Sequence, residues 1–311
     1  MNIQQLEYVI ALDTYRNFVK AAEKCHVTQA TLSMMVKKLE EELGARLFDR
    51  SKKPLIPTEV GKRIIDQARV ILQEEKRMRE IIKSESGVLS GELHLGIIPT
   101  LASYILPIFM NHFLGNYPHV RLKISELTTD EIIHKLGINQ LDAGLLATPL
   151  GKKEITEHPL FQEEFVVYAS EEQNLLKKKY ILASEIDPNE LWLLEEGHCM
   201  RSQVINLCAL KELEKEKHQL DFAAGSIETL KKIIEINKGI TILPKLALRD
   251  MSERQLQHVR YFKAPAPIRE IGIVTYRNHV KEPLIEALKK EITQHIPKEM
   301  KIDASRKPLK F

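Results

Sequence analysis

The stretch HVTQATLSMMVKKLEEELG, residues 26–44, carries a complete set of helix signals. Thr28 is a good N-cap, because its side-chain oxygen can accept a hydrogen bond from a backbone N–H of the first turn. Gly44 is a good C-cap, because glycine adopts the left-handed conformation without steric cost. The apolar residues between them follow at spacings of four, three and four, which predicts a helix with one buried face: Leu32, Val36, Leu39 and Leu43.

A shorter helix is predicted just before this one, over NFVKAAEKC at residues 17–25, with the turn at residues 26–28 between them. Two short helices joined by such a turn form a helix-turn-helix, whose second helix presents its early polar positions to the major groove of DNA. The candidate DNA-contacting residues on that helix are Gln29, Thr31, Ser33 and Lys37. We interpret Cys25, on the apolar side, as a packing residue only.

The next stretch, RLFDRSKKPLIPTEVG at residues 46–61, is typical of a hairpin wing. Arg50, Lys52 and Lys53 surround a proline-bounded extended piece and are suited to contact phosphates. Local charge adds little, because residues 1–60 hold nine Lys or Arg and eight Asp or Glu. The residue pattern alone therefore leaves a plain helical bundle open as the alternative.

Residues 5–62 resemble the winged helix-turn-helix of the LysR-type transcriptional regulators. The resemblance is carried by four blocks in order: AAEKCHVTQ, KLEEELG, LFDR and PTEVG. It implies an all-α winged helix-turn-helix domain that binds a double-stranded operator. Met34, on the DNA-reading helix, and Met35 stand where many members of the family carry Arg and Gln, so the base preference of relatives does not transfer.

A long helix is predicted from Thr58 to about Ser84. Its apolar residues recur at heptad-like spacing, which favours packing against a partner helix over packing on the chain's own body: Ile64, Ala68, Ile71, Met78 and Ile82. A dimerising linker would also give the two-fold symmetry that paired half-sites need. The small residues of SESGVLSG, 84–91, then predict a hinge.

Beyond the hinge, short apolar strands alternate with helices, which indicates α/β units with a mainly parallel sheet. We expect two subdomains, with the chain crossing between them at EEFVVYAS and returning near FKAPAPIRE. Ligands bind at the carboxyl ends of parallel strands, here near Thr100, Thr129 and Cys199. Through GELHLGIIPTLASYILP, LDAGLLA and GITILP, this half resembles the LysR effector domain, which is similar to periplasmic binding proteins.

The expected organisation has five parts. These are a DNA-binding domain (1–58), a dimerising linker helix (59–86), a hinge (87–91), a redox-sensing regulatory domain (92–302) and a tail (303–311). Within the regulatory domain, subdomain I comprises about 92–164 and 268–302, and subdomain II about 165–267. The polar tail is assigned no role.

Two of the chain's three cysteines lie in GHCMRSQVINLC, residues 197–208. A helix from Cys199 to Cys208 would hold their Cα atoms about 13 Å apart, whereas a disulfide needs roughly 5.5 Å. The pair is therefore either unrelated or closes only when the segment changes shape. A helix N-terminus with His198 and Arg201 nearby favours a Cys199 thiolate, and Thr100 and Thr129 could hold a peroxide oxygen or a water.

The spacing of these residues matches peroxide-sensing members of the LysR family, through G-H-C-x-R-x-Q and a second cysteine nine residues after the first. The resemblance implies that Cys199 reacts with hydrogen peroxide and Cys208 resolves the product as a disulfide. It implies assistance from His198, Arg201, Thr100, Thr129 and Arg269. It also implies a homo-oligomer, a dimer of dimers, with RNA polymerase and a thiol reductant system as further partners. Ser202 is a departure, because relatives carry Asp there.

Composition limits the alternatives. The chain has 311 residues, no strong net charge (+3), and no apolar run or signal sequence that would take it to a membrane, so a cytoplasmic location is expected. No cofactor is expected, and the spacings of His198, Cys199, Cys208 and His218 match no compact zinc site. The remaining alternatives are a LysR-type regulator that senses a small anionic metabolite in the inter-subdomain cleft, with incidental cysteines, and a thiol peroxidase. We predict a regulator and not an enzyme.

Overall fold

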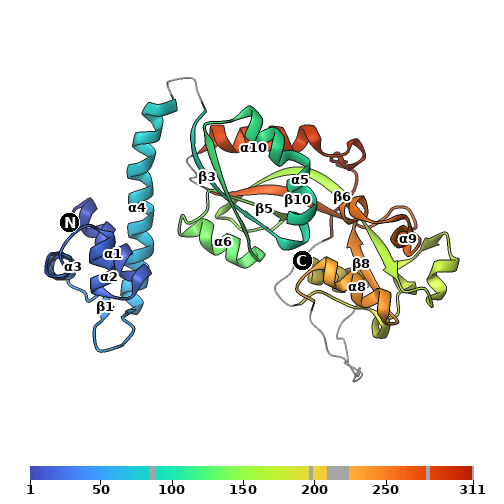
Figure 1. Ribbon diagram of the computed structural model, residues 1–311, viewed down its shortest axis with the longest axis horizontal. Coiled ribbons are helices and arrows are strands. Elements are labelled where there is room, and N and C mark those ends of the chain that lie inside the picture. The colour runs from blue at the N-terminus through green and yellow to red at the C-terminus, as the bar shows by residue number, and fades with distance from the viewer. Residues whose placement is uncertain (85–88, 196–198, 209–223, 278–280, 310–311) are drawn as a thin grey trace. The chain divides into compact units, whose positions relative to one another are not determined.

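The computed structural model describes residues 1–84, 89–195, 199–208, 224–277 and 281–309. The chain divides into two compact units, each described by itself below (Figure 1). The first comprises Met1–Val88 with Gly137–Gln140, and the second comprises Leu89–Leu136 with Leu141–Phe311.

The first unit is a winged helix-turn-helix. Its helices are α1 (Ile3–Tyr15), α2 (Phe18–Lys24), α3 (Gln29–Leu43) and α4 (Glu59–Ser84), and its wing is the antiparallel pair β1 (Phe48–Asp49) and β2 (Ile56–Pro57). The predicted caps of α3 are confirmed: Thr28 Oγ1 accepts a hydrogen bond from Thr31 N at 3.1 Å, and Gly44 has a φ of 66°. Leu32, Val36 and Leu39 are fully buried, whereas Leu43 is 37% exposed, because it lies at the open end of the helix.

The predicted long helix is confirmed as α4, which begins after Thr58, whose hydroxyl accepts a hydrogen bond from Gly61 N at 2.9 Å. Its first half packs on its own unit, because Ala68 is buried in the core and Ile64 and Ile71 pack partly against it. Met78, farther along, is 68% exposed. The side chain of Ile82 lies outside the described residues, so the dimerising role of the stripe stays a prediction.

The second unit contains a mixed sheet with the strand order β4-β3-β5-β10-β6-β9-β7, and β8 also pairs with β6. The strands are β3 (Gly91–Ile97), β4 (Val120–Glu126), β5 (Ala143–Thr148), β6 (Ile155–Ala169), β7 (Tyr180–Ile181), β8 (Ile240–Pro244), β9 (Val259–Phe262) and β10 (Ile268–Tyr276). The helices are α5 (Pro99–Asn116), α6 (Thr129–Gly137), α7 (Cys199–Leu207), α8 (Ile227–Ile236), α9 (Glu253–Leu256) and α10 (Glu282–His295). Short 3₁₀ turns span Asn174–Lys177, Ala183–Glu185, Pro188–Glu190, Lys245–Asp250 and Lys298–Met300.

Two α/β subdomains share this sheet, as predicted, and β6 is the strand that crosses between them. Its first part pairs with β10 and its second part, from Phe165 onward, pairs with β8 and β9. The expectation of a mainly parallel sheet is wrong. The pairs β3–β4, β3–β5 and β7–β9 are parallel, but every described pairing of β6 and β10 is antiparallel, so the two strands in the middle of the sheet run opposite to their neighbours.

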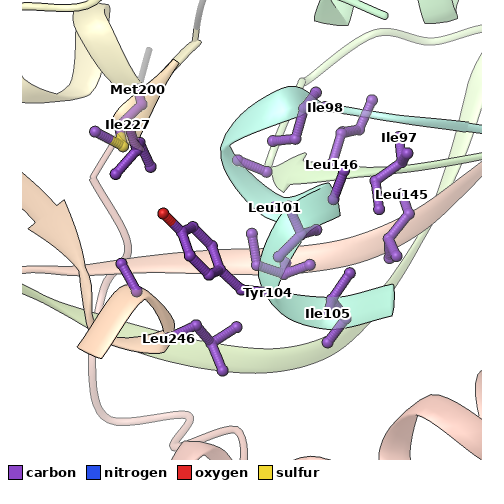
Figure 2. Packing of buried hydrophobic residues seen from close by; sticks show 14 of the residues in the cluster. Ile97, Ile98, Leu101, Tyr104, Ile105, Leu145, Leu146, Met200, Ile227 and Leu246 are labelled. Atoms are coloured by element: carbon purple, nitrogen blue, oxygen red, sulfur yellow. The ribbon is translucent and has the colours of Figure 1, made fainter. Parts of the chain in front are cut away.

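A single apolar cluster runs through both subdomains. Figure 2 shows part of it, where Leu101, Tyr104 and Ile105 of α5 lie near Leu246, and the hydroxyl end of Tyr104 points toward Met200 of α7 and Ile227 of α8. That hydroxyl donates a hydrogen bond to Glu228 Oε1 at 2.8 Å. The stretch LWLLEE, residues 191–196, is described to residue 195 and forms only isolated bridges, Leu191 with Ile240 and Leu194 with Ala224.

Gly61→Ala is expected to destabilise the first unit by at least about 2 kcal/mol, because a methyl group there has no room. A Cβ at Gly61 would lie 1.9 Å from the backbone oxygen of Leu47, which cannot move without breaking the packing of α4 on the wing. Gly115→Ala is the matched control, since a Cβ there meets nothing within 4 Å. Thermal unfolding monitored by circular dichroism measures both, and an unchanged transition for Gly61→Ala would contradict the close approach.

Candidate functional site

Both cysteines of interest lie on one helical segment. Cys199 is the first residue of α7, and the N–H of Cys208 donates to the carbonyl of Val204 at 3.1 Å, so the helical turn continues to the second cysteine. Their Cα atoms are therefore about 13 Å apart by helix rise. Both are free thiols, and Met200 and Val204 between them are 2% exposed. The interpretation that a regular helix separates the sulfurs is confirmed.

Cys199 lies at the start of α7, close to the start of α6 and within the electrostatic influence of Arg269. Thr129 is the first residue of α6, and the proximity of its hydroxyl lowers the pKa of the Cys199 thiol. Thr129 Oγ1 is buried and has no partner of ordinary hydrogen-bond geometry within the described part of the chain. Thr100, the second residue of α5, is also buried. The structure thus brings together Cys199, Thr129 and, through Arg269, Thr100.

Arg269 on β10 is completely buried and makes four contacts. Its guanidinium donates to Thr100 Oγ1 at 3.1 Å and to the Thr100 carbonyl at 3.2 Å. Its Nε donates to Glu163 Oε1 at 2.7 Å, and its Nη2 lies 2.6 Å from the same oxygen. The other oxygen of Glu163 accepts from Leu246 N at 3.2 Å. A buried pair of this kind is costly to disrupt from one side, because the remaining charge is left without a partner.

The expected low pKa of Cys199 is wrong. Although part of the residue reaches solvent, burial of the thiol raises its pKa, and this effect outweighs the opposing effects of the Arg269 charge, the Thr129 hydroxyl and the Met200 backbone N–H. The helix N-terminus and the nearby cations favour the thiolate, but desolvation of the sulfur, which depends on the assembled fold, opposes them. Burial also raises the pKa of Cys208 to about 11. Both sulfurs therefore rest as thiols near neutral pH.

The structure gives one of the two other predicted helpers, Arg201, a different partner. Arg201 donates to the carbonyl of Leu194 at 2.8 Å and so ties α7 to the preceding segment. His198 lies outside the described residues. Glu163 was missed by the sequence analysis, although it stands directly opposite Arg269 in the register of β6 and β10. An acidic residue inside the apolar strand QEEFVVYA was the available signal, but its partner depends on the strand register.

The candidate DNA surface lies on α3 and the wing. Gln29, Met34 and Lys37 are exposed, Ser33 is partly exposed, and the Thr31 hydroxyl is bonded to Thr28 Oγ1 at 2.8 Å. Lys52 and Lys53 are exposed on the wing, whereas Arg50 donates to Glu40 Oε2 at 2.9 Å. A hollow of about 450 Å³ lies beside the C-terminal half of α3 and is lined by Lys37, Glu40, Glu41, Gly44, Ala45, Arg46 and Arg50. Roles in DNA contact stay a prediction for these residues.

Within the described residues, no helix is long and apolar enough to cross a membrane, and no group of three or more His, Cys, Asp or Glu side chains is placed to hold a metal ion.

A winged helix-turn-helix followed by a two-subdomain α/β unit defines a class of DNA-binding transcription regulators, not of enzymes. Two family models match the chain: "Bacterial regulatory helix-turn-helix protein, lysR family" over residues 3–62 and "LysR substrate binding domain" over residues 86–297. The chain belongs to the LysR family of transcriptional regulators.

Several of its relatives within the family are OxyR proteins and hydrogen peroxide-inducible activators. The chain is 34% identical to the DNA-binding transcriptional dual regulator OxyR of Escherichia coli over 97% of this chain and 99% of the relative. It is 33% identical to a hydrogen peroxide-inducible genes activator of Haemophilus influenzae, covering 88% of this chain and 90% of the relative. Full-length OxyR from Pseudomonas aeruginosa, solved as a variant, superposes with a TM-score of 0.78 at 32% identity, covering 95% of this chain and 99% of that one.

Glu163→Gln is expected to destabilise the second unit by about 3–5 kcal/mol, because the buried charge of Arg269 would lose its counter-ion. Replacing both residues, Glu163→Leu with Arg269→Met, removes both charges and should recover most of the loss. Urea unfolding followed by tryptophan fluorescence measures the difference, since the chain's one tryptophan, Trp192, lies in this unit. A single variant within 1 kcal/mol of the wild type would mean that the pair contributes little.

The rate of reaction of Cys199 with hydrogen peroxide should rise by about tenfold per pH unit from pH 6 to about pH 8.5, because the thiolate is the nucleophile and its pKa is raised. The rate rises with pH because burial favours the neutral thiol. Below the pKa, the fraction of Cys199 present as thiolate falls about tenfold for each unit by which the pH is lowered. The Cys208→Ser chain isolates this first step, and Cys199→Ser is the control. A rate that is already constant at pH 6 would show instead that the thiolate is stabilised.

Proposed function

We propose that the chain is a peroxide-responsive transcription regulator in which Cys199 and Cys208 form a reversible disulfide. The observation that carries the proposal is the environment of Cys199, where a thiol, the Thr129 hydroxyl and the charge of Arg269 meet at helix starts. The names of the relatives, which are hydrogen peroxide-inducible activators and OxyR, support the same signal.

The chemistry balances with one molecule of hydrogen peroxide per disulfide. The Cys199 sulfur attacks one peroxide oxygen, the O–O bond breaks, and one water leaves, which gives a sulfenic acid at Cys199. The Cys208 sulfur then attacks the Cys199 sulfur, an S–S bond forms, and a second water leaves. The two thiol protons end in the two waters, and a cellular thiol reductant restores both cysteines.

The geometry of α7 would connect disulfide formation to a change in DNA binding. A disulfide needs Cα atoms roughly 5.5 Å apart, so the helix between residues 199 and 208 must unwind when the bond forms. The unwound segment would alter contacts between regulatory domains in a homo-oligomer, a dimer of dimers, and so reposition the helix-turn-helix pairs on the operator. Such a regulator acts where the DNA lies, in the cytoplasm, with RNA polymerase as its further partner. Exposed Met78 on α4 supports a role for the second half of the stripe in dimerisation.

Peroxide should change the footprint of the wild-type chain on DNA selected from a random library, and it should leave the footprint of Cys199→Ser unchanged. Cys25→Ala is the matched control, because Cys25 is a partly buried thiol that packs in the other unit. Mass spectrometry of tryptic peptides after brief micromolar peroxide should find the 199–208 linkage, with a mass about 2 Da below that of the two thiol peptides together.

Three outcomes separate the alternatives. A footprint that ignores both peroxide and Cys199→Ser contradicts the proposal and leaves a regulator that senses a small anionic metabolite. Steady consumption of peroxide by the purified chain with a reductant, without any change on DNA, would indicate a thiol peroxidase. A changed footprint in the absence of any 199–208 linkage would keep the peroxide signal and overturn the disulfide.

A further inference from the structure

The polar tail, to which the sequence analysis assigned no role, is attached to the second unit by specific contacts. The N–H of Asp303 donates to Gln162 Oε1 at 3.0 Å. The Arg306 guanidinium donates to Glu164 Oε1 at 3.0 Å and to the Ala266 carbonyl at 2.7 Å. The N–H of Leu309 donates to the Ile268 carbonyl at 2.9 Å, and its side chain packs against the core. Residues 303–309 therefore form a strap across β6 and the start of β10.

The strap is ordered by its own contacts as well. The Asp303 carboxylate accepts from Ser305 N at 2.9 Å and from Ser305 Oγ at 2.6 Å, and these bonds hold the pKa of Asp303 below its usual value. On β6, successive side chains alternate between the two faces of the strand. Gln162 and Glu164 hold the strap, and Glu163 between them holds Arg269.

The far end of the strap is bound to α7. Gln203 is fully buried in the middle of that helix, four residues after Cys199, and its Nε2 donates to the Leu309 carbonyl at 3.2 Å. Its Oε1 is buried without a partner in the described part of the chain. A buried amide with one hydrogen bond tolerates its loss poorly, because the whole group would then be desolvated and unpaired. Gln203 and the strap thus hold each other in place.

We propose that the strap is retained by the reduced, helical form of α7 and is released when the Cys199–Cys208 disulfide forms. This inference rests on the proposed function. Since the two Cα atoms must approach from about 13 Å to roughly 5.5 Å, the residues between them cannot all stay in the helix. Gln203 lies among those residues and cannot keep its position opposite Leu309. A contact made only in the dithiol form stabilises that form against oxidation, so the strap sets how readily the disulfide appears.

Equilibration of the full chain in glutathione redox buffers, with the fraction of disulfide measured by mass spectrometry, tests the strap. A chain truncated by a stop codon at position 303 should shift the ratio of disulfide to dithiol by about tenfold toward the disulfide, which corresponds to a midpoint potential about 30 mV lower. Arg306→Ala should shift it in the same direction by less. Lys307→Ala is the matched control and should match the wild type, because Lys307 is exposed and follows the anchoring arginine.

Hydrogen exchange of the wild-type chain gives a second, independent readout. The amide of Leu309 is hydrogen-bonded to the Ile268 carbonyl in the structure, so its exchange should be slow in the dithiol form and at least tenfold faster in the disulfide form. This comparison of the two redox forms tests release of the strap even if the truncated chain does not fold.

The failures of the two proposals are distinguishable. If peroxide produces no 199–208 linkage in the wild type, the disulfide of the proposed function is overturned and the strap proposal falls with it. If the linkage forms but the Leu309 amide keeps its protection and the truncated chain keeps the wild-type potential, only the strap proposal is overturned.

Discussion

The buried ion pair of Arg269 and Glu163 joins the two strands on which the whole regulatory unit depends. These residues stand opposite each other on β10 and on β6, the strand that both subdomains share. Because neither charge has access to water, each requires the other, and the register of the crossing strands is fixed as a result. The same guanidinium holds Thr100 and so fixes the start of α5. This one ion pair therefore helps to fix both the register of β6 and β10 and the position of the groups around Cys199.

The pairing also limits what Arg269 can do for the sulfur. Its positive charge lowers the pKa of Cys199, but Glu163 already neutralises much of that charge, and burial outweighs what remains. The raised pKa favours the protonated thiol at rest, which is a weaker nucleophile than the thiolate. An oxidant that reacts with Cys199 would have to be small enough to enter the site and able to exchange a proton there. The buried Thr129 hydroxyl has no hydrogen-bond partner within the described part of the chain, so it could bond to such an oxidant. Selectivity would follow from burial more than from high intrinsic reactivity.

Local signals in the sequence were sufficient to predict the elements whose formation depends on residues a few positions apart. The caps at Thr28 and Gly44, the wing, and the helix that separates Cys199 from Cys208 could all be predicted, because each depends on residues a few positions apart. The Glu163–Arg269 pair and the Gln203–Leu309 contact join residues about a hundred positions apart. Such contacts depend on the strand register and on where the tail docks, and neither can be read from the spacing of residues in the sequence. The thiol pKa was misjudged for the same reason, since burial is a property of the assembled fold.

The cost of unwinding α7 explains how a disulfide here could be reversible. Exposing the buried side chains of Met200 and Val204 would cost about 1.5–3 kcal/mol each, so about 4 kcal/mol opposes the oxidised form. Every 1.4 kcal/mol raises the potential of a two-electron couple by about 30 mV, and an unstrained structural disulfide lies below about −300 mV. The opposing cost would raise the potential of the couple by about 85 mV, toward the range of the cytosolic glutathione poise. The packing that keeps the sulfurs apart would therefore also favour reduction of the proposed disulfide by cellular thiols.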